Sequence, residues 1–405
     1  MAAPAFLHPF AKPSKPAADF IKLVGGKGST LWDEAGNRYL DGMASLWYCN
    51  AGYGEPRIID AVKSQLDRLV VYNTFDPWTN EPTEALAERI ASVAPFPDAR
   101  VFFGGSGSEA VDTALKLARA AQLRRGQPHK QILVSREGGY HGTNYGGTSV
   151  QGIVANREGW GELVGGVSTV PGDDIEAASR LFASQGDRIA AVIAEPVQGA
   201  GGVNPPPEGY LAGLRRLCDD HGAFLIVDEV ICGWGRLGEW FGCQHYGVTP
   251  DLITFAKGVT SGYQPLGGVV VAPSVHEPLS ADPDFLLRHG YTYSGHPTCT
   301  AAGLATLEVY EQDELFARSE AIGKLLTDGL ASLAADGIIA GYRGAGAVWA
   351  AVLEPGRDPY AVRDRMLADG VISRPLADAM AFCPPLVMTD AEVTRCVDAL
   401  ARALG

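Results

Sequence analysis

Short apolar runs alternate with helix-like stretches between about residues 100 and 275. Runs of this kind, rich in Val, Ile and Phe and without polar alternation, are typical of strands buried on both faces of a sheet. Their alternation with helices predicts βα units around a largely parallel sheet, and such sheets bind ligands at the carboxyl ends of their strands. The predicted strands are 101–103, 131–134, 189–194, 224–227, 252–255 and 268–271.

The pattern changes after about residue 300. Apolar positions at helical spacing predict helices over 301–310, 319–334, 359–370 and 390–404, and an apolar run at 347–353 predicts a strand. This part of the chain therefore reads as a smaller α+β unit.

The first forty residues contain two short strand-like runs around Gly36, a pattern that predicts a β-hairpin. Where this hairpin packs is left open by the pattern. The chain shows no internal repeat and no low-complexity tract.

The composition is that of a globular protein with a large core. The chain has 405 residues, 46% of them hydrophobic and 20% charged, which is enough for two or three domains. Acidic residues outnumber basic ones by 47 to 33, the net charge is -14, and there is no long basic run. A nucleic-acid partner is therefore not expected.

The start of the chain lacks the basic residues and apolar stretch of a secretory signal, and no run reaches the roughly 18 to 20 apolar residues that span a bilayer. We expect a cytoplasmic protein with no membrane partner. The seven cysteines include no Cys-x-x-Cys pair and the eight histidines no His-Glu-x-x-His. We therefore expect reduced thiols and no metal site.

Two ionisable residues lie at the ends of buried strands. Asp228 ends the run Phe224-Leu-Ile-Val, and Lys257 follows Leu252-Ile-Thr-Phe-Ala. A lysine in a partly dry pocket has a lowered pKa and can form a Schiff base with an aldehyde, while an aspartate can keep a pyridine nitrogen protonated. These are the requirements of pyridoxal phosphate (PLP) chemistry. In the alternative interpretation Lys257 lies on the surface and Asp228 caps the next turn.

The segment Gly104-Gly-Ser106-Gly107-Ser108 follows a predicted strand and precedes a helix. Glycines that allow close approach, hydroxyl groups and the free amides of a helix N-terminus together make a phosphate site. Ser106 could equally be a plain N-cap, with Glu109 as a partner of the helix dipole. The spacing matches neither a dinucleotide-binding motif nor a P-loop.

An aromatic residue and a histidine follow the predicted strand 131–134, in Gly138-Gly-Tyr140-His141-Gly142. Tyr140 at this strand exit is placed to stack on a planar heterocycle, and His141 could tune that ring from the side. Both could also serve only in packing.

Six motifs occur in one order and together resemble the class III aminotransferases of PLP fold type I, from about residue 30 to the C-terminus. They are Gly-Ser-Gly-Ser-Glu-Ala (105–110), Tyr-His-Gly (140–142), Glu-Pro-Val-Gln-Gly-Ala-Gly-Gly (195–202), Asp-Glu-Val-Ile-Cys-Gly-Trp-Gly-Arg-Leu-Gly (228–238), Phe-Ala-Lys-Gly (255–258) and Thr-Tyr-Ser-Gly-His-Pro (292–297). The resemblance implies an α/β fold with a large PLP-binding domain over 46–290. It also implies a small C-terminal domain over 291–405, with 1–45 joining the small domain, and a homodimer with active sites at its interface.

The resemblance also implies a role for each matching residue. Lys257 would bind the cofactor aldehyde and then act as base and acid, Asp228 would hold the pyridinium proton, and Tyr140 would stack on the ring. The other cofactor-binding residues it implies are Ser106, Gly107 and Ser108 at the phosphate, His141 and Val230 beside the ring, Glu195 near Asp228, and Thr292 at the phosphate of the neighbouring subunit.

Within this family the chain resembles the amine:pyruvate or ω-transaminase subgroup. Members that use glutamate and 2-oxoglutarate usually carry a glutamate where this chain has Ala200. Arg374 matches the flexible arginine that binds the carboxylate of the keto acid, although an ordinary surface ion pair is the alternative. Trp47, Tyr72 and Phe75 would form an apolar substrate pocket, with core packing as the alternative for Tyr72 and Phe75. The region 310–345 is shorter than is usual in the subgroup.

The expected reaction moves an amino group from a primary amine or ω-amino acid to pyruvate, giving a ketone or aldehyde and alanine. The first alternative is the 7,8-diaminopelargonate aminotransferase of biotin synthesis, which shares the Ala-Gly-Gly at 200–202. A PLP-dependent decarboxylase or aminomutase, and a non-catalytic dimeric binding protein on the same fold, are further alternatives.

Overall fold

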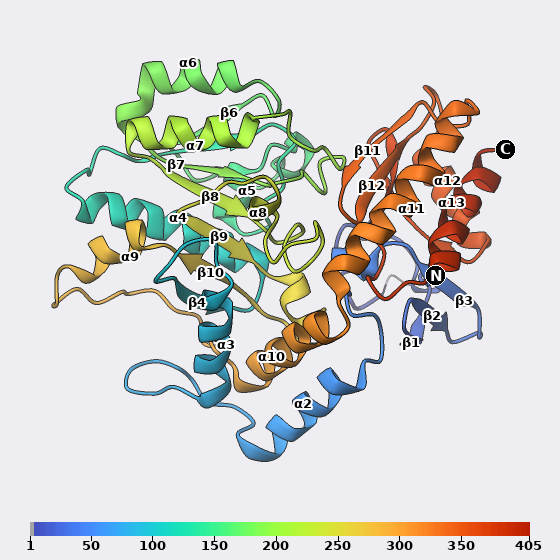
Figure 1. Ribbon diagram of the computed structural model, residues 1–405, viewed down its shortest axis with the longest axis horizontal. Coiled ribbons are helices and arrows are strands. Elements are labelled where there is room, and N and C mark those ends of the chain that lie inside the picture. Colours follow the sequence, from blue (N-terminus) through green and yellow to red (C-terminus); the bar gives the residue numbers. More distant parts are fainter. Residues whose placement is uncertain (1–3) are drawn as a thin grey trace.

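The computed structural model describes residues 4–405, and a seven-stranded sheet forms the centre of its larger part (Figure 1). The strand order is β4-β10-β9-β8-β7-β5-β6. This arrangement confirms the predicted α/β fold with a large, mostly parallel sheet. The strands are β4 (Arg100–Gly104), β5 (Ile132–Arg136), β6 (Val167–Val170), β7 (Ile189–Ala194), β8 (Phe224–Asp228), β9 (Leu252–Phe255) and β10 (Gly267–Val271).

Strands β5 to β9 pair in parallel, whereas β10 runs antiparallel to both β4 and β9. Every residue of β5, β7, β8, β9 and β10 is buried, which explains their continuous apolar runs. Strand β6 was not predicted, because it lies at the sheet edge and its Val-Ser-Thr-Val carries two polar residues.

Helices cover both faces of this sheet. Helix α4 (Gly107–Arg124) packs on β9 and β10, and α7 (Tyr210–His221) packs on β7 and β8, with α6 (Ile175–Gln185) beside α7 (Figure 1). Alternate residues of β8 enter two different cores: Phe224 and Ile226 face the core of α4, while Leu225 and Val227 face that of α7. By the same alternation the side chain of Asp228, the next residue, points to the α4 side.

A second group of helices lies along the bottom of Figure 1, where α10 packs against α2 and α3. Helix α10 begins at Pro297, earlier than predicted, because a proline is favourable at the first helical position and the His296 side chain caps the amide of Thr298. The bounds of these three helices are α2 (Pro56–Arg68), α3 (Glu81–Ser92) and α10 (Pro297–Gln312), and the larger part also contains α1 (Ala44–Trp47), α5 (Tyr145–Val150), α8 (Gly242–His245) and α9 (Pro273–Ser280).

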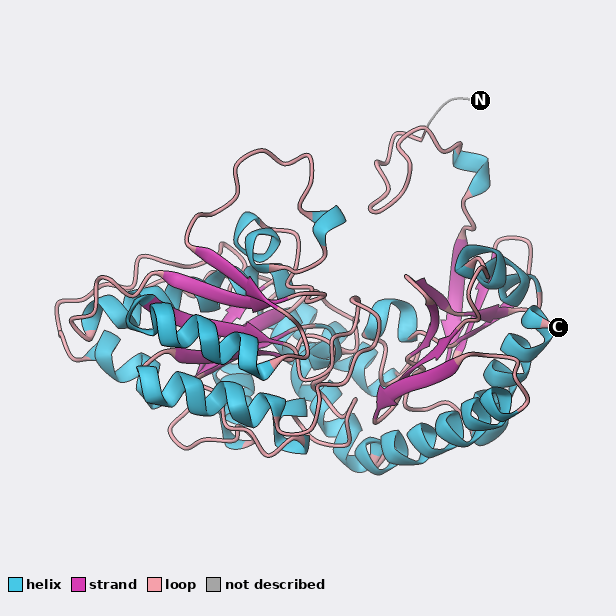
Figure 2. Ribbon diagram, turned by 90° about the horizontal axis from the view of Figure 1, so that it is seen from above, coloured by secondary structure: helices cyan, strands magenta, loops and turns pink. Residues whose placement is uncertain are grey.

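A smaller four-stranded sheet, in the order β11-β12-β15-β14, lies beside the large one (Figure 2). Its predicted helices and the predicted strand over 347–353 are confirmed within a few residues at each end. The elements are α11 (Leu315–Ala335), β11 (Gly341–Ala345), β12 (Val348–Val352), α12 (Pro359–Ala368), β14 (Arg374–Leu376), β15 (Ala379–Phe382) and α13 (Asp390–Leu404).

The predicted N-terminal hairpin is formed by β2 (Thr30–Asp33) and β3 (Arg38–Asp41), with β1 (Leu23–Lys27) added to β2. Strand β3 pairs in parallel with β13 (Val371–Ile372). The Ser29 hydroxyl donates to Glu392 Oε1 at 2.7 Å, so the hairpin packs beside α13, as Figure 1 also shows.

Two features are absent from residues 4–405. None of the helices there is long and apolar enough to cross a membrane. The same residues contain no group of three or more His, Cys, Asp or Glu side chains arranged to hold a metal ion.

Candidate active site

A cavity of about 400 Å³ opens at the carboxyl end of β8, as expected for a parallel sheet. Its wall contains every predicted cofactor-binding residue except Thr292. The residues concerned are Ser106, Gly107, Ser108, Tyr140, His141, Glu195, Asp228, Val230 and Lys257.

Asp228 is 3% exposed and accepts hydrogen bonds on both carboxylate oxygens. Its Oδ2 lies 2.7 Å from His141 Nδ1, and its Oδ1 accepts from Thr254 Oγ1 at 3.0 Å and from the amide of Val230 at 3.2 Å. His141 is itself 1% exposed. Three donors therefore stabilise a carboxylate that burial alone would disfavour.

Lys257 begins a short 3-10 helix (Lys257–Thr260) directly after β9 and has a left-handed backbone, with φ 52°. Such a conformation is uncommon outside glycine and is found mostly at functional positions. Burial lowers the pKa of the Lys257 amine, although the negative charges of Asp228 and Glu195 act in the opposite direction. The amine is therefore more readily neutral and nucleophilic than a surface lysine.

The N-terminus of α4 lies on the same cavity. Ser106 caps this helix, because its Oγ accepts from the amide of Glu109 at 3.2 Å, and Ser108 Oγ accepts from the amide of Thr143 at 3.0 Å. A Cβ atom at Gly107 would lie 3.0 Å from the Val230 side chain. Glycine at this position therefore avoids a tight contact at the start of the helix. This arrangement suits a phosphate at the helix N-terminus.

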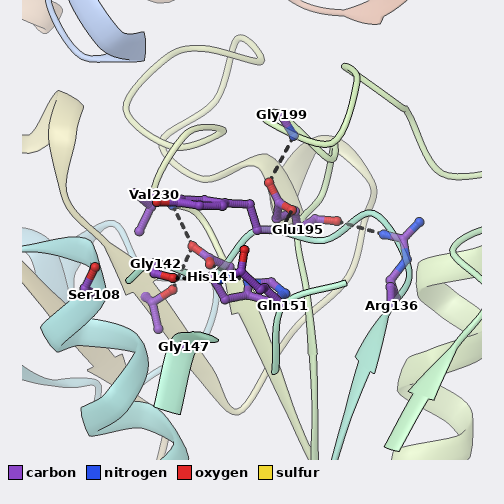
Figure 3. Close-up of polar contacts among 12 residues, drawn as sticks. Ser108, Arg136, His141, Gly142, Gly147, Gln151, Glu195, Gly199 and Val230 are labelled. Carbon is purple, nitrogen blue, oxygen red and sulfur yellow. Dashed lines mark hydrogen bonds and ion pairs between the residues drawn. The ribbon is translucent and has the colours of Figure 1, made fainter. Parts of the chain in front are cut away.

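Glu195 connects two loops that border the cavity (Figure 3). Its Oε1 accepts from the amide of Tyr140 at 2.9 Å and its Oε2 from the amide of Gly199 at 3.0 Å. Burial raises the pKa of the Glu195 carboxyl. Arg136, which the sequence did not indicate, donates to the Glu195 carbonyl at 3.1 Å and stacks on the Tyr210 ring.

Five predicted residues do not line this cavity: Trp47, Tyr72, Phe75, Thr292 and Arg374. Trp47 is 3% exposed and belongs to an apolar cluster that also contains Ile231 of the cavity wall. Tyr72 and Phe75 lie on the exposed loop between α2 and α3, and Thr292 is exposed on the segment before α10. Thr74 Oγ1 donates to the Ser294 carbonyl at 2.9 Å, so the loop between α2 and α3 lies beside the segment that precedes α10.

Arg374, at the start of β14, does not line the cavity but lies near Tyr140, which does. Burial raises the pKa of the Tyr140 phenol, and the positive charge of Arg374 opposes this shift. Burial also lowers the pKa of the Arg374 guanidinium, and its Nε is buried without a hydrogen-bond partner among residues 4–405. Arg374 forms no ion pair within the described part of the chain, so the surface ion pair considered above is not seen there.

The cavity wall also contains residues that the sequence motifs did not indicate. Tyr48 is one, and its hydroxyl accepts from Ser45 Oγ at 2.6 Å. Thr260 and Gln264 add polar groups on the same side. The only sequence signal for Tyr48 is its place beside Trp47. The signal for Thr260 and Gln264 is that both follow Lys257 within a few positions.

The side chains of this cavity fit PLP. An amine and a carboxylate, Lys257 and Asp228, share a cavity with an aromatic ring and a helix N-terminus flanked by hydroxyl groups. In addition, the buried Nε2 of His141 has no hydrogen-bond partner within residues 4–405. An aldehyde, a pyridine nitrogen, a flat ring and a phosphate would each meet a matching group here.

Comparisons with known proteins agree with this geometry. The model of the family aminotransferase class-III matches residues 12–404. The chain is 39% identical to an omega-aminotransferase of Caulobacter vibrioides over 397 residues, which cover 90% of this chain and 89% of that protein. It is 35% identical to a putrescine–pyruvate aminotransferase of Pseudomonas aeruginosa, over 94% and 91% of the two chains.

A third relative bears on the diaminopelargonate alternative considered above. The adenosylmethionine-8-amino-7-oxononanoate aminotransferase of Geobacter sulfurreducens is 32% identical, over 98% of this chain and 95% of that protein. Among solved structures, a PLP-bound amine transaminase from an uncultivated Pseudomonas species superposes with a TM-score of 0.94 at 34% identity. That match covers 100% of this chain and 99% of the other. The chain belongs to the class III aminotransferases and is a PLP-dependent ω-transaminase of fold type I.

Proposed function

We propose that this enzyme takes the amino group of a primary amine or ω-amino acid and transfers it to pyruvate, releasing a ketone or aldehyde and alanine. The observation that carries the proposal is Arg374, a half-buried side chain near Tyr140 that has no ion-pair partner within residues 4–405. A guanidinium binds a carboxylate through paired hydrogen bonds, so Arg374 is suited to the carboxylate of a keto acid. The names of two pyruvate-dependent relatives support the same acceptor.

The residue at position 200 supports pyruvate over 2-oxoglutarate. Ala200 follows Gly199 in the loop that Glu195 holds, and its methyl group cannot pair with an arginine. We propose that Arg374 therefore moves without a competing carboxylate from this loop. It would bind the keto acid in one half-reaction and withdraw for an apolar amine in the other.

The chemistry in the cavity is divided among few residues. PLP, when bound, supplies an electron sink for the pair left when a substrate carbon loses its proton. Asp228 would hold the proton on the pyridine nitrogen, and Tyr140 and Val230 would enclose the ring from its two faces. The lowered pKa of Lys257 leaves its amine able to accept the substrate proton and to return it, so that one tethered group acts as base and then as acid.

We also propose a homodimer that completes each site. Tyr72 and Phe75 are 49% and 53% exposed, and Tyr293, next to Thr292, is 68% exposed. Exposed aromatic side chains gathered on adjoining segments are typical of protein interfaces. In the dimer, Tyr72 and Phe75 would contribute to the substrate pocket and Thr292 would reach the phosphate of the neighbouring subunit.

Absorbance of the bound cofactor tests the proposed reaction. Adding 1-phenylethylamine to the purified enzyme should bleach the visible band, and adding pyruvate should restore it with release of alanine. Recovery with 2-oxoglutarate but not with pyruvate would contradict the proposed acceptor. Indifference to both ligands would refute the proposed reaction.

The 7,8-diaminopelargonate reaction is the second candidate, because a relative of that name aligns over most of the chain and the Ala-Gly-Gly at 200–202 is shared. Bleaching of the cofactor band by S-adenosylmethionine, but not by simple amines, would favour it.

A further inference from the structure

The side chain of Thr254 is a polar group within an apolar strand. Its neighbours in β9 are Leu252, Ile253 and Phe255, and all four residues are fully buried. A buried hydroxyl without a partner is costly, and valine has nearly the same shape, so a threonine here needs a reason. The hydroxyl makes one hydrogen bond within the described chain, to Asp228 Oδ1 at 3.0 Å.

Strand register produces this contact. Thr254 and Asp228 are directly paired across β9 and β8, and in a parallel sheet side chains in register point to the same face. The backbone also holds the pair together, because the amide of Glu229 donates to the Thr254 carbonyl at 2.9 Å. Lys257 follows Thr254 by three positions. The end of β9 therefore holds the threonine that donates to Asp228, and Lys257 follows the same strand.

The two oxygens of Asp228 have different surroundings. Oδ2 faces His141 Nδ1 at 2.7 Å, whereas Oδ1 depends on Thr254 and, at the longer distance of 3.2 Å, on the amide of Val230. Replacing Thr254 by an isosteric apolar residue would leave Oδ1 with that single long contact. A buried carboxylate that loses a donor is held less firmly, and its hydrogen bond to a pyridine nitrogen would be weaker.

We propose that Thr254 is a positioning residue for the transamination reaction, and that its hydroxyl holds the Asp228 carboxylate in the orientation that faces the pyridine nitrogen. This inference rests on the proposed role of Asp228. Thr254 does not touch the reacting atoms but acts through the carboxylate.

Four variants test it in the holoenzyme: Thr254→Val, Thr254→Ser, Asp228→Asn and the control Thr306→Val. Thr306 is also a fully buried threonine, but its hydroxyl bonds only to the Ala302 carbonyl of its own helix. For each variant the measurements are kcat and KM, the PLP concentration at half-saturation, and the pH at which the visible band of bound cofactor changes.

Thr254→Val should lower kcat about 10-fold or more while the KM for the amine changes less than about 2-fold, since a hydrogen bond to a charged group is lost. The pH midpoint of the cofactor band should shift by about one unit. Thr254→Ser should restore both values, and Thr306→Val should match wild type in both. A purely structural role would change the melting temperature but not the pH midpoint.

Two results separate failure of this inference from failure of the proposed role. If Asp228→Asn alters the cofactor band while Thr254→Val matches wild type, the inference about Thr254 is wrong and the role of Asp228 stands. If Asp228→Asn also matches wild type, the role of Asp228 itself is wrong.

Should Thr254→Val fail to fold, the matched pair Thr254→Ser and Thr254→Cys replaces it. Equal pH midpoints in that pair would overturn the inference, because only serine keeps a strong donor.

Discussion

His141 Nδ1 and Asp228 Oδ2 lie 2.7 Å apart in a place that solvent barely reaches. A carboxylate oxygen can only accept, so Nδ1 is the donor of this hydrogen bond. We expect His141→Asn to lower kcat by about 10-fold to 100-fold, the effect typical of losing a hydrogen bond to a buried charge. Steady-state kinetics check this, and a kcat within about 2-fold of wild type would show that the contact is dispensable.

Lys257→Ala should abolish the visible absorbance of covalently bound cofactor and reduce turnover to background, because no other amine lines the cavity among the described residues. Lys130→Ala is a matched control, since Lys130 is also buried but donates only to backbone carbonyls, for example that of His221 at 2.7 Å. The control should lose stability and keep the absorbance band. Borohydride reduction followed by mass spectrometry of the labelled peptide identifies the lysine.

Arg374→Ala should raise the KM for pyruvate by about 10-fold to 100-fold, the loss expected for one charge-assisted pair. The KM for the amine donor, measured with phenylethylamine, should stay nearly unchanged. Arg402→Ala, which removes an ion pair with Asp369, is the control and should change neither. Equal increases for amine and keto acid would instead assign Arg374 to general packing.

Gly142→Ala should weaken cofactor binding, because Gly142 has φ +93° and an added Cβ would lie 2.6 Å from Ser108 Oγ. Gly126→Ala is the control, since Gly126 has φ +74° and nothing within 4 Å of its Cβ position. Both variants should lose about 1 kcal/mol of stability from the left-handed backbone. Only Gly142→Ala should also raise the PLP concentration at half-saturation, which a fluorescence titration of the apoenzyme measures.

Glu229 introduces a pH dependence of stability. Burial raises the pKa of its carboxyl from 4.5 to about 7, against the opposing effect of the amides of Cys243 and Gly242. Between pH 4.5 and 7 the unfolded chain releases this proton while the folded chain keeps it. The free energy of unfolding should therefore fall by about 3 kcal/mol as pH rises through that window, and stay level above it.

The variant Glu229→Gln isolates this contribution, because glutamine does not titrate. It should be less stable than wild type near pH 4.5, since its side-chain oxygen cannot serve both backbone amides as well. The difference should shrink or change sign toward pH 7. Parallel stability curves for the two proteins, measured by urea denaturation, would contradict the assignment.

The sequence indicated Asp228 and Lys257 because both follow apolar runs, and the structure brings the two residues into one cavity. A charged residue after a continuous apolar run is visible in one dimension, which is how Asp228 and Lys257 were found. The hydrogen bond from Thr254 to Asp228 could not be predicted, because the pairing of these two residues depends on strand register. The partners of Arg136 are likewise carbonyls of distant segments, which no local pattern indicates.

The positions of Tyr72 and Phe75 could not be predicted, for a different reason. Tyr72 and Phe75 lie on a loop whose conformation is fixed by contacts with the segment around Ser294, far away in the chain. Strand β6 was missed because two polar residues interrupt its short run at the sheet edge. Loops and edges carry weak periodicity, so their positions follow from tertiary contacts more than from local sequence.

The pairing of β3 with β13 has a consequence for synthesis on the ribosome. Leu40 and Val371, which pair across these two strands, are more than 300 positions apart, so the N-terminal hairpin leaves the ribosome long before the strand that completes its sheet. All strands of the large sheet are translated in between and can pair first. Until β13 is synthesised, one edge of β3 therefore has no partner strand. A chain that stops before residue 371 would keep this edge unpaired, and unpaired strand edges promote aggregation.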